Sequence, residues 1–125
     1  MMGTNYFARV NLGGPSVRLH IGKSSRGWCF GLHVTDEITS LGDWRAVFAQ
    51  PFVTIVDEYD EVIPASVMLG IITERTGPTM PLGAEWLHRN HAARGPNNLA
   101  RHTYKATPPP NPATDTYDLC RGDFS

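Results

Sequence analysis

A period-two alternation of apolar and polar residues in the first third of the chain constrains the fold more than any other feature. In residues 17–21 the aliphatic side chains fall on one face of a strand, while Arg18 and His20 fall on the other. An aromatic and branched run at residues 6–12 precedes this strand, and the intervening Gly-Gly-Pro-Ser sequence favours a hairpin. Residues 28–34 alternate in the same way and predict a central strand. Strands joined by short connections favour an antiparallel sheet.

Two short amphipathic helices are predicted beside these strands. Ser40 is a good N-cap, and the apolar residues after it recur at helical spacing until Pro51 ends the segment. Residues 52–56 then predict a strand and residues 57–61 an acidic turn. Pro64 suits the first turn of a second helix, because its missing N–H costs nothing there. The stripe of that helix that we expect to be buried consists of Val67, Met68, Ile71 and Ile72.

The rest of the chain has a less regular pattern. Residues 76–112 are rich in glycine and proline and predict a long irregular basic arm, with one helical hint at residues 84–91. Residues 113–125 predict a C-terminal strand. We therefore expect a single α+β domain over residues 1–125. Its core, residues 1–75, contains two short helices and most of an antiparallel sheet of about four to six strands.

The charges fall into blocks along the chain, although the net charge at pH 7 is only −1. Residues 1–35 carry no carboxylate and a net charge of +4, and residues 36–75 carry −6. Residues 76–114 carry +3, and the residues after them carry −2. Such a block-charged surface suits the steering of a specific partner.

Cysteine usage and hydropathy indicate a cytoplasmic protein. Only Cys29 and Cys120 are present, whereas small secreted scaffolds have dense disulfide frameworks. No stretch approaches the length of a membrane span, and the first residues lack the basic and apolar pattern of a signal peptide. We expect no membrane association.

The sequence His20-Ile21-Gly22-Lys23-Ser24-Ser25, followed by Gly27-Trp28-Cys29-Phe30, resembles a motif in a family of small uncharacterised proteins of tailed bacteriophages. The pair Asp43-Trp44 and the closing Tyr117-Asp118-Leu119 are similar to further fixed points of that family. The resemblance implies a phage protein in the host cytoplasm and implies no activity. Many relatives carry a Cys-x-x-Cys-like pair between the first two strands, which suggests a metal knuckle there. This chain has residues 11–16, without cysteine, in that place.

The Gly22-Lys23-Ser24 sequence is not a Walker A site, because that motif requires a glycine where this chain has Val17. Its backbone amides, hydroxyls and cations nevertheless favour an anion nest in a loop between two strands. The alternative is a plain polar turn. The candidate residues of this anion or partner loop are His20, Lys23, Ser24, Ser25 and Arg26.

The five histidines suggest two further groupings. His20 and His33 both project from strands, on the faces opposite the aliphatic side chains, and are expected to approach each other across the sheet if the strands are neighbours, either as a catalytic or metal pair or as ordinary strand histidines. His88 and His91 would share a helix face, yet the ligand set of a zinc or nuclease motif is missing around them. We therefore expect no metal, no cofactor and no catalytic residue, and Cys29 in a core strand is expected to be inert.

The basic arm is the candidate surface for partner binding, because tryptophan and arginine dominate protein interfaces. Its candidate residues are Trp86, His88, Arg89, His91, Arg94 and Arg101. The favoured hypothesis is a non-enzymatic phage accessory protein that binds a host protein or a protein–nucleic acid complex, for example as an inhibitor of a defence or replication factor. The alternatives are a metal-dependent enzyme that processes nucleotides or nucleic acids, direct nucleic-acid binding, and a minor virion component.

Overall fold

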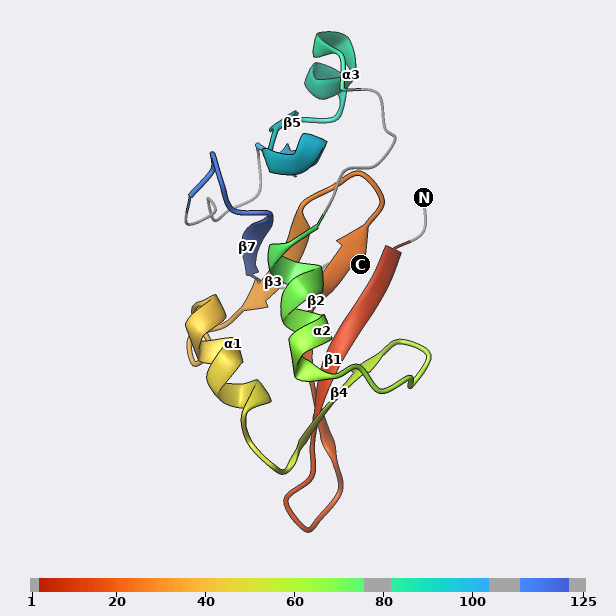
Figure 1. Ribbon diagram of the computed structural model, residues 1–125, viewed down its shortest axis with the longest axis vertical. Helices are drawn as coiled ribbons and strands as arrows, with labels where there is room; N and C mark the ends of the chain where they lie inside the picture. The colour runs from red at the N-terminus through yellow and green to blue at the C-terminus, as the bar shows by residue number, and fades with distance from the viewer. Residues whose placement is uncertain (1–2, 76–81, 104–110, 122–125) are drawn as a thin grey trace.

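A five-stranded sheet with the strand order β4-β1-β2-β3-β7 forms the centre of the molecule (Figure 1). The computed structural model describes residues 3–75, 82–103 and 111–121. The strands of the sheet are β1 (Gly3–Val10), β2 (Val17–Ser25), β3 (Phe30–Val34), β4 (Val53–Asp57) and β7 (Tyr117–Arg121). Neighbours are antiparallel except β3 and β7, which are parallel. The predicted α+β class, with a mainly antiparallel sheet of four to six strands, is confirmed.

The β1–β2 hairpin contains a bulge at the motif that begins at His20. Tyr6 pairs with Gly22 and Phe7 pairs with His20, so the residue between Gly22 and His20 has no partner on β1. A Cβ atom on Gly22 would lie 2.1 Å from the backbone oxygen of Gly31, so only glycine fits where β2 passes β3. The strand continues through this point to Ser25. The predicted loop at residues 22–27 is therefore wrong for its first four residues, because Gly22 allows β2 to approach its neighbour β3 closely and does not end the strand.

Two helices, α1 (Leu41–Phe48) and α2 (Ala65–Thr73), cover one face of the sheet (Figure 1). Ser40 caps α1 as predicted, since its Oγ accepts a hydrogen bond from the backbone N–H of Asp43 at 3.1 Å. Trp44 is only 1% exposed, and its indole N–H donates to the carbonyl oxygen of His33 at 2.8 Å. The core between helices and sheet contains Ala8, Ile21, Phe30, Leu32, Trp44, Phe48, Ile55, Met68, Ile72 and Tyr117.

The second helix buries a narrower stripe than its sequence predicts. Met68 and Ile72 are fully buried, whereas Ile71 is half-buried and Val67 is 49% exposed. Met68 and Ile72, four positions apart, face the sheet. Val67 and Ile71, one position before each of them, line a pocket together with Tyr6 of β1. The expectation that Val67 is buried is therefore wrong. The helix carries no charged residue on any face.

A small lobe, residues 82–103, lies at one end of the sheet (Figure 1). It contains α3 (Ala84–Arg89), β5 (Ala92–Arg94), the 3₁₀ helix η1 (Pro96–Asn98) and β6 (Ala100–His102), with β5 and β6 antiparallel. The predicted irregular arm is wrong for these residues, because a helix and a hairpin too short for a periodic signal form there. The predicted arm residues 76–81 and 104–110 lie outside the described residues.

Backbone hydrogen bonds join the small lobe to the turn between β2 and β3. The N–H of Ala100 donates to the carbonyl oxygen of Gly27, and the N–H of Cys29 donates to that of Ala100, both at 2.8 Å. Leu99 and Ala100 are fully buried at this junction. Among the described residues, no helix is long and apolar enough to cross a membrane.

Candidate functional site

Three aromatic side chains from distant parts of the sequence meet at the small lobe. The rings of Trp28 and His102 stack with centroids 4.3 Å apart and planes inclined by 15°. Trp86, from α3, lies 5.7 Å from Trp28 at an angle of 43°. All three are half-buried, so each ring supports its neighbour and still reaches the surface. We call this group, Trp28, Trp86 and His102, the aromatic cluster.

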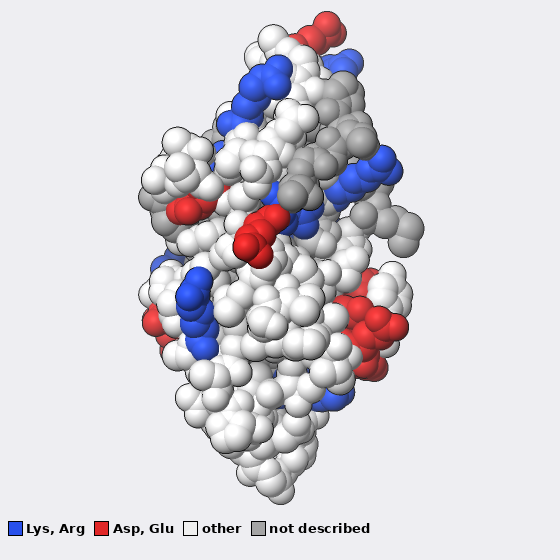
Figure 2. Space-filling view, viewed as in Figure 1, with Lys and Arg blue, Asp and Glu red and all other residues white. Residues whose placement is uncertain are grey.

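Exposed basic residues lie on the segments that carry or adjoin the aromatic cluster. Arg26 is exposed at the turn that carries Trp28, and Arg89 and Arg94 are exposed on α3 and β5. The only acidic residue in the lobe's sequence is Glu85. Figure 2 shows basic side chains on both sides of this end of the molecule and acidic atoms at its tip. The two predicted surfaces, the motif and the arm, therefore meet here through Arg26 and Trp28.

The histidines of the predicted arm do not share a helix face. Helix α3 ends at Arg89, and His91 has a φ of 51°, which takes the chain out of the helical path. His88 and His91 are both exposed. Within the described residues, no group of three or more His, Cys, Asp or Glu side chains is placed to hold a metal ion.

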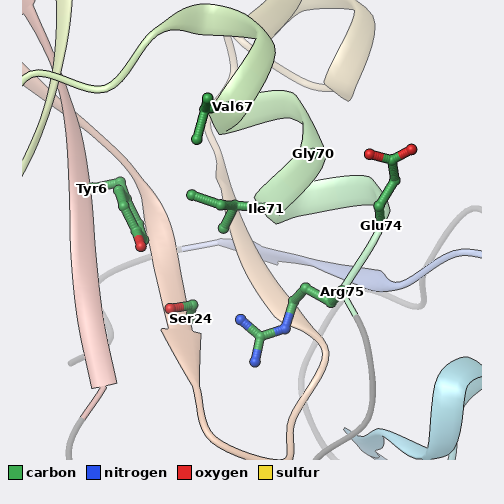
Figure 3. A pocket seen from close by; sticks show the side chains of 7 residues that line it. All are labelled: Tyr6, Ser24, Val67, Gly70, Ile71, Glu74 and Arg75. Carbon is green, nitrogen blue, oxygen red and sulfur yellow. The ribbon is translucent and has the colours of Figure 1, made fainter.

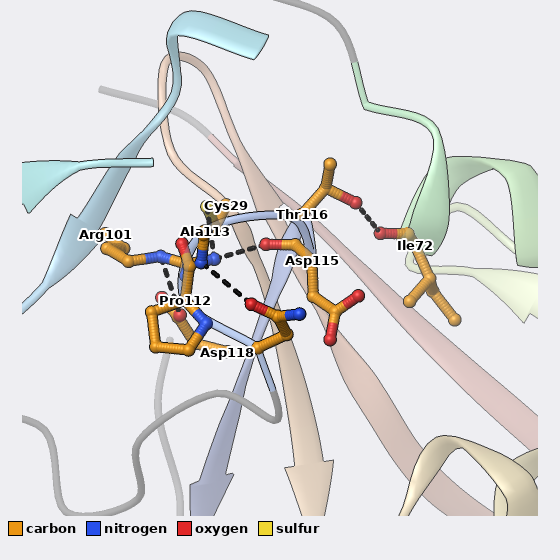
Figure 4. Close-up of polar contacts among 9 residues, drawn as sticks. Cys29, Ile72, Arg101, Pro112, Ala113, Asp115, Thr116 and Asp118 are labelled. Atoms are coloured by element: carbon orange, nitrogen blue, oxygen red, sulfur yellow. Dashed lines mark hydrogen bonds and ion pairs between the residues drawn. The ribbon is translucent and has the colours of Figure 1, made fainter. Parts of the chain in front are cut away.

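Arg101 does not belong to the exposed surface, in contrast to the sequence prediction. It is only 5% exposed, and its guanidinium points into the junction between β6 and the segment that leads to β7 (Figure 4). It donates to the carbonyl oxygen of Pro112 at 2.7 Å, to that of Asp115, and to the sulfur of Cys29 at 3.3 Å. Its Nε lies 3.4 Å from a carboxylate oxygen of Asp118. Arg101 therefore holds the lobe on the sheet.

Burial governs the protonation of the groups around Arg101. Asp118 is 4% exposed, and its desolvation raises its pKa from 3.8 to about 6, although Arg101 and the backbone N–H of His102 act in the opposite direction. Burial also raises the pKa of the Cys29 thiol, and the contact with Arg101 offsets part of that rise. The neutral thiol is therefore favoured, which suits a structural cysteine better than a nucleophile.

The remaining motif residues lie on two different faces of the sheet. His20 and His33 approach each other on the face without helices, as predicted, with ring centroids 5.5 Å apart. Nε2 of His20 lies 3.0 Å from the side-chain oxygen of Asn5, and Nδ1 of His33 lies 3.0 Å from the carbonyl oxygen of His20. Phe7 stacks on His20, and the Arg18 guanidinium lies 4.0 Å above the Phe7 ring. These contacts fit ordinary packing of strand side chains.

Lys23, Ser24 and Ser25 are part of β2 and pair with β1. An extended strand does not form the concave run of amides that an anion nest requires, so the predicted nest is wrong at these residues. Ser24 instead lines a pocket beside α2, together with Arg75. No sequence pattern indicates a role for Arg75, because an arginine after a helix is ordinary in any surface segment.

The aromatic cluster is also a contact that sequence reasoning missed. Trp28 was expected at the entry of a strand and Trp86 on an exposed arm, and no local pattern joins the two. Compared with models of protein families, with curated proteins and with solved structures, the chain matches none of them.

Proposed function

We propose that the protein is an accessory protein of a tailed bacteriophage that binds a host macromolecule through the aromatic cluster and the arginines around it. The observation that carries the proposal is the contact of Trp28 with Trp86 at the surface of a lobe with a net positive charge. The resemblance of the motif at residues 20–30 to phage proteins supports the origin and the host cytoplasm as the place of action.

The composition of this surface is that of an interaction hot spot. Tryptophan and arginine are the residues whose loss most often weakens protein interfaces. The neighbouring Arg26, Arg89 and Arg94 favour a partner with an acidic surface. We infer an acidic host protein as the partner, and inhibition as the consequence of covering that surface.

The framework of the lobe favours a preformed surface. The backbone of Trp28, in the turn between β2 and β3, pairs with that of Ala100 in β6. Arg101 fixes β6 against the segment before β7 and against Asp118. A partner that meets side chains already in place loses less conformational entropy on binding. This argument favours binding without a large rearrangement of the lobe.

The proposal is tested by capturing partners of the tagged protein from lysates of infected host cells. Trp86→Ala is expected to reduce the captured host protein at least tenfold, since loss of a hot-spot tryptophan typically costs more than about 2 kcal/mol. Tyr59→Ala is the matched control, because Tyr59 is 66% exposed and lies on the acidic turn after β4.

Equal capture by the wild type and by a folded Trp86→Ala variant would contradict the proposal. If nuclease treatment abolishes the capture, the partner is nucleic acid and not a host protein, because tryptophan and arginine also stack on bases. Circular dichroism of each variant shows whether the fold is retained.

A further inference from the structure

A pocket of about 540 Å³ lies between α2 and the adjoining strands β1 and β2, away from the aromatic cluster (Figure 3). Its volume falls within the usual range for small-molecule sites, roughly 300–1,000 Å³. It is a shallow depression that is wide open to solvent, and it is lined by Tyr6, Ser24, Val67, Gly70, Ile71, Glu74 and Arg75. The pocket thus combines an apolar wall with several polar groups.

Arg75 supplies a cation that has no carboxylate partner. One of its terminal nitrogens donates to the carbonyl oxygen of Ser25 at 2.7 Å, which fixes the guanidinium toward β2 (Figure 3). Its backbone oxygen accepts from the side chain of Asn97 at 2.6 Å. Among the described residues, no Asp or Glu oxygen lies within 4.0 Å of Arg75. Partial burial lowers its pKa, so the charge is held at a desolvation cost that a bound anion would offset.

Two hydroxyl groups, of Tyr6 and Ser24, line the same pocket as this cation and point toward each other in Figure 3. The structure gives no hydrogen-bond partner for the side-chain hydroxyl of Tyr6 or of Ser24 within the described chain, and both side chains line the pocket. The Nε of Arg75 is buried and also lacks an acceptor there. The Tyr6 and Ser24 hydroxyls and the Nε of Arg75 are donors without an acceptor among the described residues, although a terminal nitrogen of Arg75 already donates to Ser25. Donors of this kind that line one pocket suit an anionic group.

The opposite wall is aliphatic. Val67 and Ile71 project from α2, which carries no charged residue, and Figure 2 shows an uncharged surface where this helix lies. Gly70 adds no side chain between them, and the Glu74 carboxylate lies over it, with Oε2 3.2 Å from where a Cβ atom of residue 70 would stand. This wall suits the hydrocarbon body of a ligand.

Glu74 limits the charge that the pocket accepts. It lies at the rim and its carboxylate points away from the guanidinium (Figure 3). One cation and one nearby carboxylate favour a ligand with a single negative charge over a phosphate dianion. We propose that this pocket binds a small organic monoanion, a carboxylic acid with an aliphatic body, through Arg75 and the hydroxyls of Tyr6 and Ser24. This site is independent of the proposed partner surface.

Octanoate is the probe, and two-dimensional amide NMR of the full chain is the measurement. Saturable shifts are expected for the amides of residues 6, 24 and 67–75, and octan-1-ol, which has the same chain length without the charge, is expected to bind at least tenfold more weakly. Arg75→Gln should weaken octanoate binding about tenfold or more, as expected for loss of a hydrogen bond to a charged group. Arg45→Gln, at an exposed arginine on α1, is the matched control and should bind like the wild type.

Tyr6→Phe keeps the test decisive if Arg75→Gln fails to fold. It removes only a hydroxyl group, so the fold should be retained while octanoate binding weakens about threefold. Equal affinity for octanoate and octan-1-ol, or octanoate binding that neither variant weakens, would overturn the proposal. Shifts spread over the whole sheet, with no saturation, would do the same.

Discussion

Replacing Asp118 by Asn removes a buried negative charge that the folded protein holds at a cost. The carboxylate is 4% exposed, and the charged group facing it is Arg101, 3.4 Å away, with the Cys29 thiol beyond. Burial nevertheless raises the pKa of Asp118 from 3.8 to about 6, so desolvation outweighs the attraction of Arg101. The folded state therefore prefers the neutral side chain, which asparagine resembles.

The size of the effect follows from the change in proton affinity. A pKa that rises from 3.8 in the unfolded chain to about 6 in the folded chain corresponds to about 3 kcal/mol. Because the folded-state pKa of this acid is raised, its ionisation lowers the free energy of unfolding as pH rises from 3.8 through about 6. Asp118→Asn should match the wild type near pH 4 and exceed its stability by up to about 3 kcal/mol near pH 7.5.

Urea unfolding followed by tryptophan fluorescence at both pH values measures this difference. Asp36→Asn is the control, because Asp36 pairs with Arg121 at 3.0 Å while its side chain is 98% exposed, and little change is expected at either pH. A variant Asp118→Asn that is less stable than the wild type by the same amount at both pH values would refute the reasoning. The ion pair with Arg101 would then stabilise the fold, and the pKa of Asp118 would not be raised.

Three further predictions concern the framework, and thermal and urea unfolding test them. Trp44→Ala should lower the free energy of unfolding by about 3–5 kcal/mol, because it empties a fully buried site. Trp86→Ala should lower it clearly less, and the reverse order would place Trp86 in the core. Gly22→Ala should lower the melting temperature strongly, because its Cβ would meet the oxygen of Gly31; an unchanged melting temperature would show that the two strands separate easily. Ser40→Ala should cost about 1 kcal/mol through loss of the cap on α1, whereas Ser40→Asp should not, and equal losses would exclude capping as the cause.

Local patterns in the sequence were sufficient for most of the core. The alternation at residues 17–21 and 28–34 predicts β2 and β3, although β2 continues to Ser25 and β3 begins only at Phe30. Ser40 marks the start of α1. These elements can be predicted because the period of a strand or a helix determines which of its side chains share one face. The bulge beside Gly22 could not be predicted, because a glycine that ends a strand and a glycine that allows two neighbouring strands to approach closely look the same in sequence.

The candidate site was only partly predictable for the same reason. Trp86 was singled out by its residue type, but its contact with Trp28 depends on the small lobe folding back onto the β2–β3 turn. Arg101 resembles the other arginines of the segment in sequence, yet carbonyl oxygens from residues 112 and 115 bury it. Contacts between distant segments leave no trace in local periodicity, so tertiary packing decided which arginines reach the surface.

The parallel pairing of β7 with β3 also has a consequence for the order of folding. Phe30 is in register with Tyr117, and its N–H donates to the carbonyl oxygen of Thr116 at 3.0 Å. The sheet is therefore complete only when segments more than 80 residues apart in the sequence have met. Contacts of such long range slow folding, because the intervening chain must be ordered before the pair forms. Until then β3 is an unprotected edge whose backbone can pair with another chain, and a ribosome that stalls before Tyr117 would release a product prone to aggregation.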